Sequence, residues 1–195
     1  MSRVSQAQAQ ENRRRVVETA ARLFREQGTA VSVVDVMQAA GLTHGGFYKQ
    51  FASKDALIGE AAAYAFDEQA KRRALTLEDS GGERIAAQQA VINSYLSPRH
   101  RDNPAEGCPA AALAGEIGRT GEHSEGRKAY IDGVEELIKW FATEDDDADG
   151  IARLSSMVGA LVLARATNGS ELSDRILDSV RTLLTSSSSS SSYSS

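Results

Sequence analysis

Apolar residues recur at helical spacing along almost the whole chain. Alternating runs of Val, Ile, Thr and Tyr bounded by turn residues, which are typical of strands, are missing. The chain contains only three prolines, which suits long helices because proline interrupts helical hydrogen bonding. The pattern therefore predicts an all-α fold with roughly nine helices.

The chain begins with two predicted helices that are separated by turn residues. The first covers about residues 11–26 and ends at Gly28. The second opens at Ser32, which together with Asp35 has the form of a capping box, and it breaks at Gly41. The second helix is therefore expected to be short.

A third, short helix is predicted from Thr43, which is placed to cap it, to about residue 50. Together with the second helix and its tight turn, it forms a predicted helix-turn-helix over roughly residues 32–51. Gly45 and Gly46 lie inside the third helix, where each costs about 1 kcal/mol relative to alanine. Close approach of DNA explains these missing side chains, and so does close packing against a neighbouring helix.

The remaining pattern predicts further helices joined by polar connections. Ser53 is placed to cap a long fourth helix, and the others are expected near residues 85–96, 109–118, 130–141, 151–162 and 172–183. Residues 97–107 are interpreted as a loop, and the acidic run 144–147 as a solvated connection. The serine-rich segment 185–195 is expected to be a disordered or artefactual tail.

Charge is distributed unevenly along the chain. The net charge of −5 argues against a nucleic-acid partner at first sight. Residues 1–54, however, hold eight basic and four acidic residues, a net charge of +4, so the rest of the chain carries −9. This asymmetry indicates a DNA-binding module joined to an acidic body, although chance scatter of charges would also produce it.

Composition excludes several classes of protein. The chain has 195 residues, of which 41% are hydrophobic and 25% charged, as in ordinary globular proteins. Its apolar runs are too short to span a bilayer and the start lacks the apolar centre of a secretory signal, so a cytoplasmic protein with no membrane partner is expected. The single cysteine excludes an internal disulfide and a multi-cysteine zinc site. No metal or cofactor is expected.

Residues 13–60 resemble the N-terminal signature of the TetR family of bacterial regulators. The segment 15–28 is similar to the first helix of the family, 32–40 to its second, and 41–57 to its recognition helix and the start of the connecting helix. Gln50 departs from the pattern, because the family often carries histidine or another aromatic there. The resemblance implies a helix-turn-helix domain at 1–54 and a helical regulatory and dimerisation domain at 55–184.

The candidate DNA-binding residues surround the predicted recognition helix. Hydroxyl and ammonium groups are suited to phosphate, and His44, Gly45 and Lys49 are placed for base edges or nearby phosphates. Phe47 and Phe51 are expected to be core residues instead. The candidates are Ser32, Thr43, His44, Gly45, Gly46, Tyr48, Lys49 and Lys54.

Two further surfaces are predicted in the second domain. Small residues in the penultimate helix permit close helix approach and the last helix supplies an apolar face, so a dimer interface is expected at Ser155, Gly159, Leu172, Ile176 and Val180. The alternative is an intrachain core. A cavity for a small-molecule effector is expected among Tyr64, Tyr95, Cys108, Tyr130, Trp140, Phe141 and Met157, each of which could equally be plain core.

Cys108 is also a candidate sensor of oxidants or electrophiles. It precedes Pro109 at a predicted helix N-terminus, where the helix dipole favours a thiolate, and Arg99 or Arg101 could lie nearby. The alternative is a small, buried and inert cysteine.

The sequence thus predicts a ligand-responsive, DNA-binding transcriptional regulator and not an enzyme. By resemblance it is a repressor that binds palindromic operator DNA as a homodimer and is released by a small-molecule effector or by modification of Cys108. Two other classes stay open: an enzyme that uses Cys108 with His100 or His123, and a helical adaptor that binds only protein.

Overall fold

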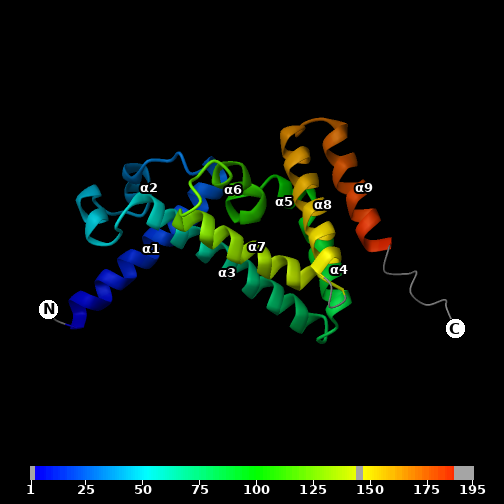
Figure 1. The fold of residues 1–195 in the computed structure, drawn as a ribbon, viewed down its shortest axis with the longest axis horizontal. Coiled ribbons are helices and arrows are strands. Elements are labelled where there is room, and N and C mark those ends of the chain that lie inside the picture. Colours follow the sequence, from blue (N-terminus) through cyan, green and yellow to red (C-terminus); the bar gives the residue numbers. More distant parts are fainter. Residues whose placement is uncertain (1–2, 144–146, 187–195) are drawn as a thin grey trace. The chain divides into compact units, whose positions relative to one another are not determined.

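The computed structural model describes residues 3–143 and 147–186. Within these residues the chain forms nine α-helices and two 3-10 helices and contains no strand (Figure 1). The predicted all-α fold is therefore confirmed. Contacts divide the described residues into two compact units, the first made of 3–68 and 108–133, and the second of 69–107, 134–143 and 147–186.

The first unit contains the predicted helix-turn-helix and two later helical segments. Its elements are α1 (Arg3–Gln27), α2 (Val33–Ala39), the 3-10 helix η1 (His44–Lys49), the first part of α3 (Lys54–Asp79), α6 (Pro109–Ile117) and the first part of α7 (Glu125–Phe141). Long helices α3 and α7 thus contribute residues to both units.

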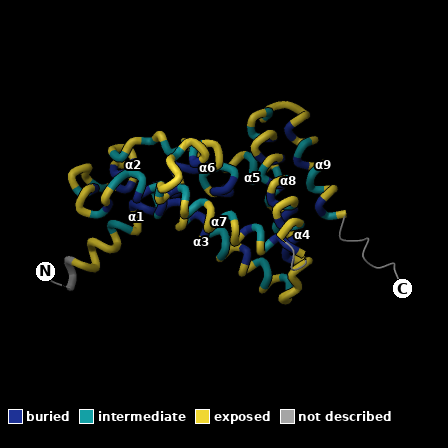
Figure 2. Tube along the Cα trace, viewed as in Figure 1, coloured by how far each residue is buried: buried dark blue, intermediate teal, exposed yellow. Residues whose placement is uncertain are grey.

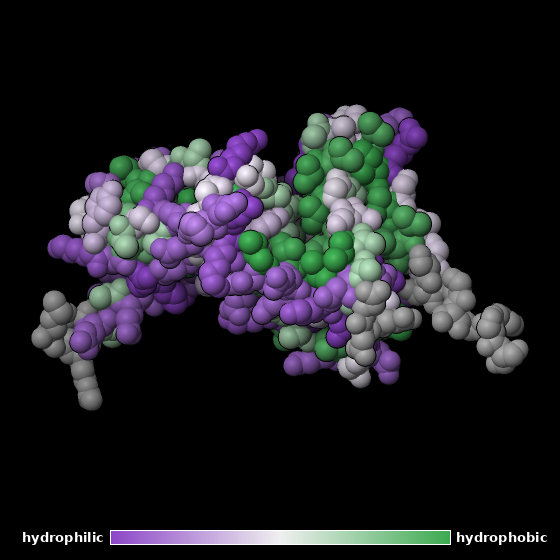
Figure 3. Space-filling model, viewed as in Figure 1, coloured by the Kyte–Doolittle hydropathy of each residue, from purple (hydrophilic) through white to green (hydrophobic). Residues whose placement is uncertain are grey.

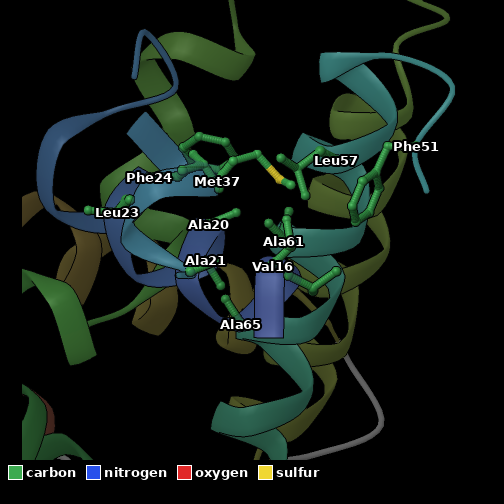
Figure 4. Close-up of a cluster of buried hydrophobic side chains, with 14 of the residues drawn as sticks. Val16, Ala20, Ala21, Leu23, Phe24, Met37, Phe51, Leu57, Ala61 and Ala65 are labelled. Carbon is green, nitrogen blue, oxygen red and sulfur yellow. The ribbon is translucent and has the colours of Figure 1, made fainter. Parts of the chain in front are cut away.

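One apolar core holds the first unit together (Figure 4). Phe24 of α1, Met37 of α2 and Leu57 of α3 are almost completely buried in it. Burying a side chain of this size stabilises the fold by about 1.5–3 kcal/mol. Leu113 and Ile117 of α6 belong to the same core, and α6 packs against α1. The helix-turn-helix therefore shares its core with α6, a segment that is distant from it in the sequence.

The second unit is built on the pair α8 and α9. Its elements are α4 (Arg84–Tyr95), α5 (Pro98–Arg101), the 3-10 helix η2 (Pro104–Glu106), α8 (Asp147–Ala166), α9 (Glu171–Ser186) and the remaining parts of α3 and α7. Helices α8 and α9 pack side by side, and α4 packs on α9 (Figure 1). Ile92, Met157 and Leu177 are completely buried between these helices.

Several helix ends differ from the prediction for identifiable reasons. Helix α1 begins at Arg3 instead of near residue 11, because Ala and Gln favour a helix even without an apolar stripe. Helix α7 begins at Glu125 instead of residue 130, since the hydroxyl of Ser124 accepts a hydrogen bond from the Arg127 amide at 3.0 Å. The predicted starts of both helices were wrong.

The predicted connections also contain helical structure. Helices α5 and η2 lie inside the segment 97–107 that was expected to be a loop, and Asp147 of the acidic run begins α8. Helix α9 continues to Ser186, so the first two residues of the expected tail are helical. The rest of that tail and residues 144–146 of the acidic run lie outside the described residues.

Candidate functional site

The turn between α2 and η1 is fixed by backbone and side-chain hydrogen bonds. The Ser32 hydroxyl caps α2 by accepting from the Asp35 amide at 3.1 Å and donates to the Asp35 carboxylate at 2.6 Å. At the other end, the Leu42 amide donates to the Met37 carbonyl at 2.9 Å, which requires the left-handed conformation of Gly41 (φ +70°). The predicted capping of α2 and its break at Gly41 are confirmed.

Residues 43–49, called the recognition segment below, differ from the short α-helix that was predicted. Residues His44–Lys49 of this segment form a 3-10 helix, in keeping with the low α-helix propensity of two consecutive glycines. Thr43 precedes this helix, but its side chain makes no capping hydrogen bond, so the predicted cap was wrong. Phe47 is completely buried and stacks on Phe51 with 5.4 Å between the ring centres, as expected for core residues.

Neither backbone conformation nor packing within the chain requires glycine at the two glycine positions of the recognition segment. Neither has a positive φ. A Cβ atom on Gly45 would have no atom of the described chain within 4 Å, and on Gly46 it would lie 3.7 Å from the Met37 methyl group, an ordinary contact. Close packing against a neighbouring helix therefore does not account for Gly45, which is exposed.

Most residues of the recognition segment are exposed to solvent (Figure 2). Thr43, His44 and Lys49 are exposed, and 71% of Tyr48 is accessible. The Tyr48 ring packs edge-on against Phe47 with 5.0 Å between ring centres, which holds the hydroxyl away from the core. Lys54 is partly buried at the start of α3, which the Ser53 hydroxyl caps as predicted by accepting from the Ala56 amide at 3.0 Å.

Comparison with known proteins places the helix-turn-helix in a family. Residues 16–61 match the family described as bacterial regulatory proteins, tetR family. The HTH-type transcriptional regulator AcrR of Shigella flexneri is 38% identical over 61 residues, which is 31% of this chain and 28% of that protein. A TetR transcriptional regulator of Chloroflexus aurantiacus has 27% sequence identity and a TM-score of 0.74, over 92% of this chain and 95% of that one.

The chain thus carries a tetR-family helix-turn-helix and, over most of its length, has the fold of a TetR transcriptional regulator. Two more solved structures share the fold alone: a TetR-family regulator of Agrobacterium tumefaciens, with 19% identity, 91% and 98% coverage and a TM-score of 0.74, and the reduced form of Escherichia coli NemR, with 17% identity, 87% and 95% coverage and a TM-score of 0.72. The match to a family of bacterial regulatory proteins favours a DNA-binding regulator over the predicted enzyme alternative.

Most arginines of α1 are already paired within the protein. Arg14 pairs with Glu11 at 2.7 Å and also with Glu18, and Arg22 pairs with Glu26 at 3.5 Å. By contrast, neither Lys49 nor Lys54 forms an ion pair with any carboxylate of the described residues. Part of the positive excess counted from the sequence therefore lies at these two lysines, whereas the exposed Arg15 of α1 donates to Asn12 at 3.0 Å.

Arg13 has a structural role that the sequence did not reveal. Its guanidinium donates to the Gln50 carbonyl, pairs with Glu60 and lies 4.3 Å from the centre of the Phe51 ring. These contacts join α1 to the end of the recognition segment and to α3. Partners that lie 37 and 47 residues away carry no local sequence signal.

Helices α8 and α9 carry an exposed apolar surface (Figure 3). Leu172 is 48% accessible, Ser155 and Gly159 are exposed, and Ile176 and Val180 are partly buried. A Cβ atom on Gly159 would meet nothing within 4 Å. Further exposed apolar side chains extend the same surface, namely Ile151, Val162, Leu163 and Leu183.

The second unit also contains a cavity of about 460 Å³. Of the predicted ligand residues, Tyr95 lines it. Its wall is otherwise mostly polar and cationic, and includes Arg72, Arg73, Arg99, His100 and Glu106. The predicted ligand site was chosen from aromatic residues and one cysteine and one methionine, so it did not include these side chains. The basic segments at 72–73 and 99–101 were the signal available in the sequence.

The other predicted ligand residues have surroundings of their own. In the first unit, the Tyr64 hydroxyl donates to Glu18 at 3.3 Å and the Tyr130 hydroxyl donates to the Ala110 carbonyl at 2.8 Å. Burial raises the pKa of each tyrosine to about 12. In the second unit, Trp140 packs edge-on against Phe141, and Phe141 and Met157 are buried core residues.

Cys108 precedes α6 and is 5% accessible. At the other end of α6, the Glu116 carboxylate accepts a hydrogen bond from the Thr29 amide, just after α1. Arg101 is engaged by Asp102, Asp174 and Ser173.

Within the described residues, no helix is long and apolar enough to cross a membrane, and no group of three or more metal-binding side chains is assembled.

Proposed function

We propose that the protein is a homodimeric repressor that binds palindromic operator DNA through the recognition segment and is released by a small-molecule effector. The observation that carries this proposal is the bare, exposed backbone at Gly45 beside two lysines that have no carboxylate partner in the described chain. A surface without side chains allows a phosphate or base edge to come close to the backbone, and the ammonium groups supply the charge.

The roles within this surface follow from chemistry and exposure. Lys49 and Lys54 are phosphate ligands, and the hydroxyls of Tyr48 and Thr43 donate to phosphate oxygens. His44 lies on the same exposed segment and is the candidate for a base-edge contact. The Ser32 hydroxyl is engaged in the cap of α2, so it contacts DNA only in addition to that role.

Two copies of the recognition segment are needed for a specific site. One short helix covers a few base pairs, so a two-fold dimer reads two half-sites about 34 Å or a multiple of that distance apart. The exposed apolar surface of α8 and α9 is the proposed interface, because a contiguous apolar surface on a helix pair is costly to leave in water. Four helices would then form the dimer bundle.

The test of DNA recognition is selection from a random duplex library at about 0.1–0.15 M salt, followed by sequencing of the retained duplexes. We expect a palindrome to be enriched, and Lys49→Glu to abolish the enrichment. Lys139→Glu is the matched control, since Lys139 is an exposed lysine of the second unit. If no sequence is enriched by the dimeric protein, specific DNA recognition is refuted and the protein-binding adaptor becomes the better account.

The test of the dimer is its mass in solution. Gly159→Arg places a charge on the proposed interface without an intrachain clash, so we expect sedimentation to show a monomer with unchanged helical content. Ala90→Arg, at an exposed position of α4, serves as the control and stays dimeric. A Gly159→Arg protein that remains dimeric would refute this interface.

Modification of Cys108 is a second route by which DNA could be released. Cys108 directly precedes α6, which packs on α1 and accepts a hydrogen bond from Thr29 through Glu116. A bulky adduct at Cys108 would therefore displace a helix that supports the helix-turn-helix. One neighbour with the same fold, E. coli NemR, is described in a reduced form. Cys108→Ser should make operator binding insensitive to oxidants and electrophiles. Unchanged sensitivity in that variant would eliminate this route.

A further inference from the structure

We propose that the cavity of the second unit binds a small organic anion, in which a carboxylate, phosphate or sulfonate is joined to an apolar body. This inference rests on the proposed function for its biological meaning, because it names the chemical class of the effector. Binding itself can be tested without DNA.

The charge of the cavity wall carries the proposal. Arg72, Arg73 and Arg99 line the cavity, and Glu106 is the one carboxylate among its lining residues. Glu106 accepts from the Arg72 guanidinium at 2.8 Å, so one negative charge is shared with one of three positive charges. The residues that line the cavity therefore include three arginines and a single carboxylate. Such an excess favours an anionic ligand, particularly where protein atoms exclude part of the water.

The two other arginines differ in burial. Arg99 is exposed and forms no ion pair or hydrogen bond with the described residues. Arg73 is only 8% accessible, and its guanidinium lies 5.6 Å from the centre of the Trp140 ring. A guanidinium supplies planar pairs of donors that match carboxylate or phosphate oxygens. Arg99 is thus an exposed anchor for an anion, and the buried Arg73 adds positive charge to the same cavity wall.

Neutral groups shape the rest of the cavity. His100 bonds through Nδ1 to the Tyr95 carbonyl at 2.8 Å, and its ring lies 4.5 Å from that of Tyr95. Burial lowers the pKa of His100, and the nearby charges of Arg165 and Arg72 lower it further. His100 is therefore neutral at pH 7 and adds hydrogen-bonding capacity without charge. The Tyr95 ring and Val91 supply apolar surface for the body of a ligand.

The wall that carries Arg99 and His100 is tied to the helices of the proposed dimer interface. Arg165 of α8 donates to the carbonyl oxygens of Arg101 at 3.2 Å and His100 at 3.3 Å. Arg101 in turn donates to Asp174 of α9 at 2.7 Å. An anion that draws Arg99 inward would therefore act on a segment anchored to both α8 and α9.

A pair of fluorescent probes separates charge from hydrophobicity. Anilinonaphthalene sulfonate carries an anion on an aromatic body, and phenylnaphthylamine has the same body without the anion. Trp140, the single tryptophan of the chain, lies beside Arg73, so energy transfer from Trp140 reports a probe bound in its neighbourhood, and the variant described next assigns the probe to the cavity. We expect saturable binding of the sulfonate with energy transfer from Trp140, and much weaker binding of the neutral amine.

The variant Arg99→Gln sharpens the test. Loss of a charge-assisted hydrogen bond should weaken sulfonate binding about tenfold or more, with no change for the neutral amine. Arg175→Gln is the matched control, because Arg175 is an exposed arginine of α9 outside the cavity wall. Absence of saturable sulfonate binding, equal affinity for both probes, or an unchanged affinity in Arg99→Gln would overturn the proposal. Failure of operator selection would leave these titrations unaffected, so the two proposals fail separately.

Discussion

The arginines of α1 and the lysines beside the recognition segment carry the same charge in different surroundings. Arg14 and Arg22 are paired with glutamates of their own helix, and Arg13 bridges α1, Gln50 and Glu60. Lys49 and Lys54 have no such partner among the described residues. Counting charges along a sequence treats both sets alike, whereas only unpaired cations attract phosphate without first breaking an internal contact.

The second unit repeats this contrast. Arg101 and Arg165 are engaged by side chains and carbonyl groups and hold α5 against α8 and α9, while Arg99 lies on the same short helix without an ion pair in the described chain. In both units, then, paired arginines build the fold and a neighbouring unpaired cation is available for a ligand. Variants that remove or reverse a paired or an unpaired cation test this comparison.

The largest effect is expected from reversing an unpaired charge. Lys49→Glu places a carboxylate at the proposed phosphate contact of both protomers, so operator affinity should fall by about 100-fold or more. Circular dichroism should be unchanged, because the Lys49 side chain is exposed. Affinity measured by fluorescence anisotropy checks the prediction, and a loss of less than threefold would contradict the proposed contact.

Removing a structural cation should affect stability before affinity. Arg13→Ala deletes a hydrogen bond, an ion pair and a cation–π contact that are partly shielded from water. We expect the free energy of unfolding to fall by about 1–2 kcal/mol. Urea denaturation measures this change. Arg15→Ala is the control, because Arg15 is exposed and donates a hydrogen bond to Asn12 of the same helix.

Gly45→Ala should separate stability from DNA binding. Alanine favours a helix over glycine and meets no neighbour at this position, so the unfolding free energy should rise by about 0.4–1 kcal/mol. The added methyl group would occupy the surface assigned to DNA, and we expect operator affinity to fall about tenfold. If affinity stays at the wild-type level while stability rises, DNA does not approach Gly45.

The smallest effect concerns His100 and pH. Because burial lowers the folded-state pKa of His100 below its ordinary 6.5, the unfolded chain binds more protons as the pH falls below that value. The stability that the neutral ring provides is complete above pH 6.5 and declines as the pH drops toward the folded-state pKa. His100→Asn should flatten the pH dependence of the thermal midpoint in this window. An identical pH profile would show that His100 does not titrate differently in the folded state.

Local signals account for what the sequence could predict. Ser32, Gly41 and Ser53 mark helix ends through side-chain caps and a left-handed turn, and each acts within four residues. Buried Phe47 and Phe51 followed from their apolar character and spacing. The family signature in residues 16–61 lies in the same region, so the sequence could predict both the local fold and the candidate DNA site there.

Long-range pairing explains what the sequence could not show. The partners of Arg13 lie in other elements, and the cavity assembles α3 with the segment after α4, where aromatic residues were expected and arginines are found. The 3-10 form of the recognition segment also escaped prediction, since helix type depends on how Phe47 is anchored as well as on two glycines. The periodicity of apolar residues shows which face of a helix is buried, but it does not show which charged side chains form ion pairs.

The most direct test of the account compares how operator affinity depends on salt in the wild type, Lys49→Ala and Arg14→Ala. One lost phosphate contact per protomer should reduce the slope of log affinity against log salt by about 2 for the dimer in Lys49→Ala. Arg14→Ala should leave the slope unchanged, because its charge is balanced by Glu11 and Glu18. A wild-type slope in Lys49→Ala, or an equal reduction in Arg14→Ala, would contradict the claim that unpaired cations of the recognition segment bind the operator.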